Sequence, residues 1–231
     1  MSSVIPVITL DGPSGVGKGT IGLKLAHHLK WHFLDSGALY RILAWEAHQQ
    51  NISLDQVTTL AALATELQPT FQILPENLSL IIKLRDQNIT DAIRTEAYAT
   101  HASRLAVYPQ IRQALLACQH HFRQAPGLVA DGRDMGSVVF PDANHKFFLT
   151  ASHDARAQRR YLQLKQRGNH ASLSKLKTAI LQRDTRDRSR PVAALKAAPD
   201  ALSIDTTTLS IDEVFLTIMQ LVSNVSKYAM N

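Results

Sequence analysis

Short apolar runs alternate with longer segments of helical periodicity along most of the chain, and this pattern predicts the fold. The first run, "VIPVITL" at 4–10, is rich in β-branched residues and stops at Asp11-Gly12-Pro13, as buried strands do. Similar runs predict further strands at 32–34, 128–131, 145–150 and 200–205. These strands are short enough to belong to a buried sheet.

Apolar residues spaced three to four positions apart predict helices between the strands. The expected helices cover 18–30, 37–48, 91–107, 109–124, 153–167, 172–184 and 210–222. Ser36 is the expected N-cap of the helix 37–48, and Ser53 with Gln56 forms a capping-box pattern that opens another helix. The predicted class is therefore α/β, with a parallel sheet covered by helices on both faces.

Residues 66–92 depart from this pattern. Apolar and polar positions alternate there, and two turn sequences interrupt them, Pro75-Glu76-Asn77 and Asp86-Gln87-Asn88. We expect a small meander of short strands that does not join the parallel sheet. The predicted organisation is one domain over residues 1–231 with this β-rich insert.

A glycine-rich turn, "DGPSGVGKGT" at 11–20, follows the first predicted strand and opens the first predicted helix. Its spacing fits the phosphate loop G-x-x-x-x-G-K, in which glycines let backbone N–H groups surround a phosphate. Lys18 adds a mobile positive charge for the β- and γ-phosphates. We expect a nucleoside triphosphate to contact Gly12, Pro13, Ser14, Gly15, Val16, Gly17, Lys18, Gly19 and Thr20.

The hydroxyl that usually follows the lysine of such a loop is displaced by one position. Gly19 occupies its place, and Thr20 comes one residue later. In the common loop this hydroxyl binds Mg²⁺. We expect Mg²⁺ to be held mainly by phosphates and water, with Thr20 or Ser14 as the nearest protein hydroxyls, and the metal ligands stay open.

The chain has 231 residues, a formal net charge of +6 and a pI of about 9.6, which suits an anionic ligand. Arginines crowd into 153–190, where Asp184 and Asp187 interrupt them. Such carboxylates would repel an extended polyphosphate, so this mixture favours a compact site over a nucleic-acid track. The apolar runs are too short to cross a bilayer.

The single cysteine, Cys118, lies in a predicted helix and is interpreted as a buried thiol rather than a nucleophile. The first residues lack the basic patch and apolar segment of a signal peptide. Together these features favour a reducing cytoplasm.

The nature of the acceptor group can be inferred from the many arginines and from the lack of an evident general base in the sequence. A phosphate monoester is already ionised near neutral pH, because its second pKa is about 6, and it needs no general base. It needs cations that cancel its repulsion with the donor phosphates, and arginines supply them. Spaced arginines without an evident base therefore indicate phosphoryl transfer to a phosphate.

Several motifs together resemble the bacterial cytidylate kinases, members of the nucleoside monophosphate kinase family. They are "DGPSGVGKGT", "LDSGALYR", "IRTEA", "ADGRDMGSVVFPDA" and "RDTRDRSR", in order over nearly the whole chain. The resemblance implies ATP-dependent phosphorylation of CMP and dCMP to CDP and dCDP, with Mg²⁺. It implies a cytoplasmic enzyme of pyrimidine metabolism, with no nucleic-acid or membrane partner, and nothing in the sequence demands more than a monomer.

The resemblance also implies roles for individual residues. Lys18, Arg133 and Arg183 would be catalytic, and 153–190 would form a lid that brings Arg156, Arg159 or Arg160 to the donor phosphates. The implied CMP-binding residues are Ser36, Tyr40, Arg41, Ser103, Arg112, Arg133, Asp134, Arg183, Asp187 and Arg190. Among them Arg41 and Arg133 would grip the acceptor phosphate, and Asp187 would accept hydrogen bonds from ribose.

Two other functions are also compatible with the sequence. A kinase that phosphorylates an alcohol would need a general base, for which Asp35 is the candidate. An RNA-binding switch would suit the basic pI, but aromatic residues make up 6% of the chain and no RNA-reading motif is present. The choice among CMP, dCMP and UMP depends on pocket shape and also stays open.

Overall fold

Five parallel strands form the central sheet of the computed structural model, which describes residues 5–166, 168, 171–190 and 192–228. The order is β2-β6-β1-β7-β8. The strands are β1 (Val7–Asp11), β2 (His32–Asp35), β6 (Leu128–Asp131), β7 (His145–Thr150) and β8 (Leu202–Asp205). The predicted α/β class and all five strands are confirmed. The first strand begins after Pro6, which has no N–H to donate to a ladder.

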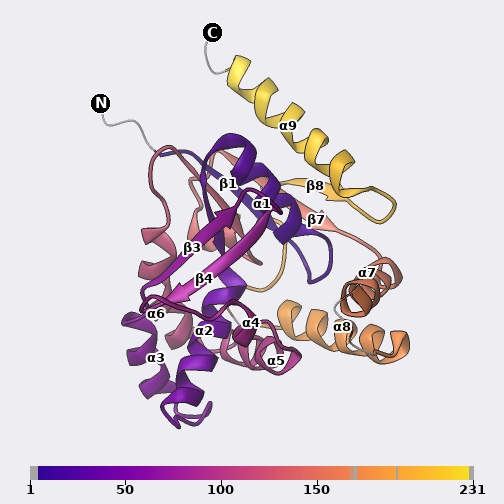
Figure 1. Cartoon of the computed structure of the whole chain (residues 1–231). Coiled ribbons are helices and arrows are strands. Elements are labelled where there is room, and N and C mark those ends of the chain that lie inside the picture. The colour runs from indigo at the N-terminus through magenta and orange to yellow at the C-terminus, as the bar shows by residue number, and fades with distance from the viewer. Residues whose placement is uncertain (1–4, 167, 169–170, 191, 229–231) are drawn as a thin grey trace.

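Helices cover the sheet in two groups (Figure 1). The group with α1 (Lys18–Leu29) and α9 (Ile211–Tyr228), which pack on each other, lies apart from the group with α2 (Ser36–Gln49), α3 (Val57–Thr65) and α6 (Pro109–His121). The helices α7 (His153–Gln166) and α8 (Leu173–Arg188) pack together beside one end of the sheet. Residues 167, 169 and 170 of the predicted lid lie outside the described residues.

The stretch predicted as a meander forms a separate antiparallel sheet of β3 (Pro69–Leu74), β4 (Ser79–Leu84) and β5 (Gln87–Asn88). Alternate residues of β4 are buried, which gives the sheet one apolar face. Thr90, which follows β5, bonds to β4: the Thr90 hydroxyl accepts a hydrogen bond from the Ile82 N–H at 2.8 Å.

Two predicted helix starts were wrong. Asp35, not Ser36, is the N-cap of α2, and its Oδ1 accepts from the Ala38 N–H at 3.0 Å. Ser36 is instead the first helical residue. Ser53 and Gln56 form no capping box, because the Ser53 hydroxyl accepts from the nearby Asp55 N–H and α3 begins only at Val57.

The predicted helix 91–107 is two helices, α4 (Thr90–Ile93) and α5 (Glu96–Leu105). The break falls at Thr95, which has an extended backbone and caps α5 by accepting from the Tyr98 N–H at 3.3 Å. A threonine that caps a new helix competes with helix continuation, and the apolar spacing alone does not reveal this. After β6, a π-helix (Met135–Val139) leads on toward β7.

Candidate active site

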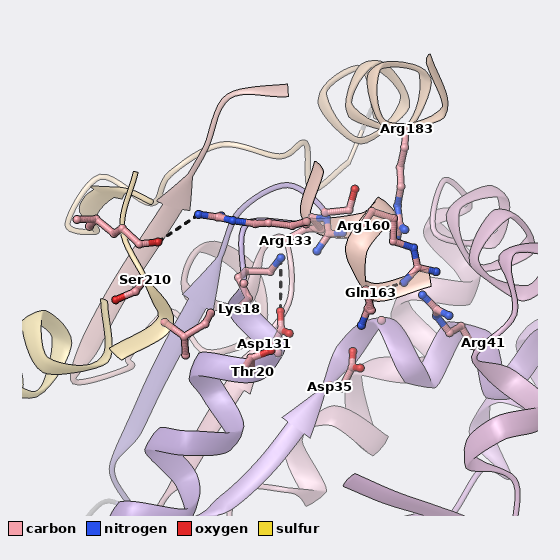
Figure 2. Close-up of a pocket in the computed structure, with 18 residues that line it drawn as sticks. Lys18, Thr20, Asp35, Arg41, Asp131, Arg133, Arg160, Gln163, Arg183 and Ser210 are labelled. Atoms are coloured by element: carbon pink, nitrogen blue, oxygen red, sulfur yellow. Dashed lines mark hydrogen bonds and ion pairs between the residues drawn. The ribbon is translucent and has the colours of Figure 1, made fainter. Parts of the chain in front are cut away.

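The carboxyl ends of β1, β2 and β6 meet at one edge of the sheet, since Leu10 and Asp35 are both in register with Asp131. The loops that follow these strands, together with residues of α7 and α8, line a cavity of about 580 Å³ (Figure 2). Open α/β sheets bind their ligands at this edge. The cavity is lined by Ser14, Gly15, Gly17, Lys18, Gly19, Thr20, Asp35, Gly37, Arg41, Asp131, Arg133, Arg159, Arg160, Gln163, Arg183, Leu209, Ser210 and Ile211.

The phosphate loop has the backbone that its glycines allow. Gly12, Gly15 and Gly17 have φ values of 144°, 81° and 100°, which L side chains rarely adopt. A Cβ on Gly12 would also lie 2.1 Å from the Leu149 carbonyl oxygen. The loop therefore ends at the N-terminus of α1 with its backbone open to the cavity, as phosphate binding requires.

The side chain of Lys18 is held in place. Its Nζ donates to the Pro13 carbonyl at 2.9 Å and lies 3.7 Å from Asp131 Oδ1 (Figure 2). Burial, together with the nearby charge of Arg133, lowers the pKa of Lys18 to about 8, and Asp131 opposes the shift. Burial likewise raises the pKa of Asp131 to about 6. An incoming polyanion would favour the charged lysine.

Arginines from three elements converge on the other side of the cavity. Figure 2 shows Arg183 reaching from α8 and Arg41 from α2 toward the same space, with Arg133 from the loop after β6 nearby. Burial, together with the charge of Arg133, lowers the pKa of Arg183 to about 10. The Nε of Arg183 is buried and has no partner among the described residues. Such a cluster of guanidiniums is suited to a second phosphate.

Asp11 holds the loop that carries Arg133. Its two carboxylate oxygens accept from the Met135 and Gly136 N–H groups, both at 2.8 Å. Burial raises the pKa of Asp11 to about 7. This residue at the end of β1 therefore links the phosphate loop to the "DGRDMG" loop.

A second, smaller pocket adjoins the first. It is lined by Ser36, Gly37, Tyr40, Ala102, Ser103, Ala106, Arg112, Gly132, Arg133, Asp134, Arg183 and Arg190. Arg112 forms a buried ion pair with Asp134 and donates to the Tyr40 hydroxyl at 3.3 Å. Burial raises the pKa of Tyr40 to about 12, so its hydroxyl stays neutral. The Ser103 hydroxyl is buried and has no partner among the described residues, which leaves it free for a ligand.

Five of the predicted site residues line neither of these two pockets: Gly12, Pro13, Val16, Arg156 and Asp187. Asp187 is fully buried and lines neither pocket, because its oxygens are taken by Arg133 and Arg190. Arg156 does not line the large cavity either, and its guanidinium is engaged with Asp184. Arg159 does line the cavity and donates to the Thr206 hydroxyl at 3.1 Å.

The segment Leu209–Ile211, which follows β8 and reaches the first residue of α9, also lines the cavity and was not predicted from the sequence. Its position after a predicted strand was a usable signal, but it carries no charge and was passed over. Cys118 lines neither of the two pockets; burial raises the pKa of its thiol to about 11, which disfavours the thiolate.

The residues around the phosphate loop are compatible with an Mg²⁺ ion that is held mostly by substrate phosphates and water. Among the described residues, no three His, Cys, Asp or Glu side chains gather as a metal site. The cavity nevertheless offers the Thr20 hydroxyl and the carboxylates of Asp35 and Asp131. A few oxygen ligands suit an ion that keeps several waters and binds substrate phosphates.

A phosphate loop that faces clustered arginines defines the site of a phosphotransferase. The cytidylate kinase family model matches residues 8–224, and the chain therefore belongs to the cytidylate kinase family. The cytidylate kinase of Aeromonas salmonicida is 50% identical over 219 residues, 95% of this chain and 94% of the relative. That of Stutzerimonas stutzeri is 51% identical over 224 residues, 97% and 98% of the two chains. The predicted family is confirmed.

Among solved structures, an uncharacterized protein from Eubacterium ventriosum has a similar fold, with a TM-score of 0.50 and 12% identity. The match covers 95% of this chain and 99% of that chain. None of the helices in the described part of the chain is both long and apolar enough to span a membrane.

Proposed function

We propose that this kinase transfers the γ-phosphoryl group of ATP to CMP and dCMP by direct in-line attack of the acceptor phosphate. One observation carries the proposal: the large cavity at the phosphate loop and the small pocket share Gly37, Arg133 and Arg183. A triphosphate in the first and a monophosphate in the second would therefore meet at two arginines. Membership of the cytidylate kinase family supports the same reaction.

The donor phosphates lie along the phosphate loop, with Lys18 on the β- and γ-phosphates. Arg159 and Arg160 line the same cavity from α7 and add positive charge. Mg²⁺ fits near Thr20 and Asp131, and it would supply further neutralisation of the phosphate charge when bound.

The acceptor phosphate lies among Arg41, Arg133 and Arg183. It is ionised near neutral pH and attacks without a general base, so these residues act by position and charge. Six cationic side chains line the large cavity against the two carboxylates of Asp35 and Asp131, which offsets the repulsion between the two polyanions.

The small pocket takes the base. Cytosine presents an N4 amino donor and acceptors at N3 and O2. Ser103 and Asp134 offer oxygens to the donor, and Arg112 and Arg190 offer N–H groups to the acceptors. Ser36 and Tyr40 complete the walls of the pocket.

We expect the deoxyribonucleotide to be accepted as well. Asp187 is the residue implied for ribose hydroxyls, but both of its carboxylate oxygens are engaged by arginines. A missing 2′-hydroxyl would then leave no protein group unpaired, and such a loss is what makes an enzyme reject an analogue.

We further propose a single kinase domain in which 66–92 is the monophosphate-side insert and 153–190 the lid, acting as a monomer in the cytoplasm. The phosphate loop, the clustered arginines and the residues of the small pocket all lie on this chain. Closure of a lid would exclude water, which otherwise competes for the phosphoryl group.

A panel of acceptors tests the proposal: ADP release is measured with ATP, Mg²⁺ and CMP, dCMP, UMP or AMP. We expect the highest kcat/KM with CMP and comparable turnover with dCMP. Full activity on AMP with none on CMP would overturn the assignment of the base pocket. Turnover on alcohols would instead favour Asp35 as a base, and salt-sensitive RNA binding would favour a nucleic-acid role.

A further inference from the structure

Arg156 occupies an unusual place for a residue implied to bind ATP. It lies in the first turn of α7 and is 1% exposed, behind the phosphate loop rather than in the cavity. Its Cβ packs so closely on Gly15 that a Cβ there would come within 3.1 Å. Burial of a guanidinium is costly unless its N–H groups find partners, and the partners of Arg156 show what it does.

The partners come from three separate segments. Arg156 Nη1 and Nη2 donate to the two carboxylate oxygens of Asp184 on α8, at 3.0 and 2.6 Å. Nη1 also donates to the Ser14 carbonyl of the phosphate loop at 3.1 Å, and Nε donates to the Ala151 carbonyl at 3.1 Å. Four of the five N–H groups of the guanidinium are thus used within the protein.

Asp184 is equally committed. It is 3% exposed, accepts both bonds from Arg156 and lies 3.3 Å from His153 Nε2. It stands next to Arg183, which lines both pockets, and three residues before Asp187, which orients Arg133 through a 2.9 Å hydrogen bond. The contact between Arg156 and Asp184 therefore also holds the neighbouring residues of α8, Arg183 and Asp187, which face the acceptor side of the site.

We propose that Arg156 and Asp184 are a positioning pair, which sets α8 and its acceptor-side residues against the donor phosphate loop and does not contact ATP. The pair makes the base of the predicted lid a rigid part of the site. In-line transfer depends on the spacing between donor and acceptor, and an error of about 1 Å can cost on the order of 100-fold in rate. The proposal rests on the proposed function, because it concerns the rate of the same transfer.

The test compares Arg156→Lys, Asp184→Asn and the apolar double variant Arg156→Met/Asp184→Leu. Lysine keeps the charge but cannot donate in one plane to Asp184 and Ser14 together. The double variant keeps the volume and avoids a lone buried charge, so it should fold if a single variant does not. A matched control is Asp154→Asn/Lys177→Met, which removes an exposed ion pair between the same two helices. Lys177 Nζ lies 2.5 Å from Asp154 Oδ1 in this pair.

We expect kcat to fall roughly 10- to 100-fold in Arg156→Lys and Asp184→Asn, with the KM for ATP within about 3-fold of the wild type. The double variant should be no worse than the single variants, because both residues act as one unit. The exposed control pair should retain the wild-type kcat. ADP affinity, measured by calorimetry, should stay within about 3-fold throughout, and thermal melting should show which variants are folded.

Two results would overturn the pair's role. A folded double variant with wild-type kcat would make the pair structural only. A loss of ADP affinity of about 10-fold or more in that variant, with CMP affinity unchanged, would make Arg156 a donor-phosphate ligand. Failure of the proposed function would look different, because the wild-type protein itself would then not phosphorylate CMP.

Discussion

Arg133 donates its Nε–H to Asp187 at 2.9 Å, and this bond joins the loop after β6 to α8. Arg190 holds the other oxygen of the same carboxylate. Burial alone would raise the pKa of Asp187, but the guanidiniums of Arg133, Arg190 and Arg183 outweigh it, and the pKa lies below its usual value. Asp187 is thus an ionised carboxylate that orients the Arg133 side chain toward the acceptor side of the cavity.

Arg133→Ala should lower kcat by at least about 100-fold, because it removes a charge placed where the two phosphates meet. ADP affinity should stay within about 3-fold, since Lys18 and the phosphate loop are untouched. Initial rates with saturating CMP and calorimetry with ADP measure the two effects. Arg123→Ala is the matched control, because Arg123 is tied to Ile5 and Asp142 and lines neither pocket. Unchanged turnover in Arg133→Ala would remove this residue from the site.

The activity of the free enzyme should fall above a pH of about 8, the pKa to which burial lowers Lys18. Deprotonation removes the charge that attracts the donor phosphates, so kcat/KM for ATP should decline while the protein stays folded. The acid side is less informative, because Asp131 and the substrate phosphate both titrate near pH 6. A pH series of kcat/KM measures the alkaline limb.

The assignment of that limb to Lys18 can be checked with Asp131→Asn. Asp131 raises the pKa of Lys18, so its neutralisation should move the limb below pH 8. Lys18→Arg should abolish the limb at any residual activity, because arginine stays charged. A limb that does not move in Asp131→Asn would assign it to another group.

The parts of this molecule that were predictable are those encoded by neighbouring residues. The strand β1, the glycines of the phosphate loop and the meander follow from spacing and turn chemistry within about ten residues. The carboxyl-end rule then brought the loops after β1, β2 and β6 together. The same rule applies to Leu209–Ile211 after β8, but this segment has no charged residue that marks it as part of a phosphate site.

The destinations of individual side chains were less predictable, because their partners are distant in the sequence. Arg156 bonds to Asp184, 28 residues away, and to Ser14, 142 residues away. Ser36 begins a helix after a strand, which favours a capping role, but its hydroxyl is bonded by Gln119 of α6. The local sequence indicates which nearby groups a hydroxyl or guanidinium could bond to. The tertiary packing determines which group it does bond to.

Ser103→Ala should separate ligand binding from stability. The Ser103 hydroxyl is buried without a partner among the described residues, so its removal should leave the free energy of unfolding equal or slightly higher. The KM for CMP should rise by roughly 5- to 30-fold, the loss of about one hydrogen bond of 1–2 kcal/mol. Denaturant unfolding and initial rates measure the two effects.

Ser36→Ala is the matched substitution in the same pocket, with the opposite sign for stability. The Ser36 hydroxyl accepts from Gln119 Nε2 at 2.8 Å, and its removal leaves a buried amide unpaired. We expect the free energy of unfolding to fall by about 1–3 kcal/mol. If Ser103→Ala were the more destabilising of the two, the Ser103 hydroxyl would have a partner within the protein. It would then not be available to bind the base.

The need for Mg²⁺ should depend more on Asp131 than on Thr20. Chelation of the metal should abolish turnover, because Mg²⁺ would neutralise charge on the β- and γ-phosphates in addition to what the arginines and Lys18 neutralise. Thr20→Ala removes one neutral hydroxyl and should raise the Mg²⁺ concentration for half-maximal rate only a few-fold, whereas Asp131→Asn removes a charge and should raise it by about 10-fold or more. Rates measured over a Mg²⁺ titration at fixed ATP decide the order. A larger effect of Thr20→Ala would mean that the displaced hydroxyl has taken over the role of the usual loop hydroxyl.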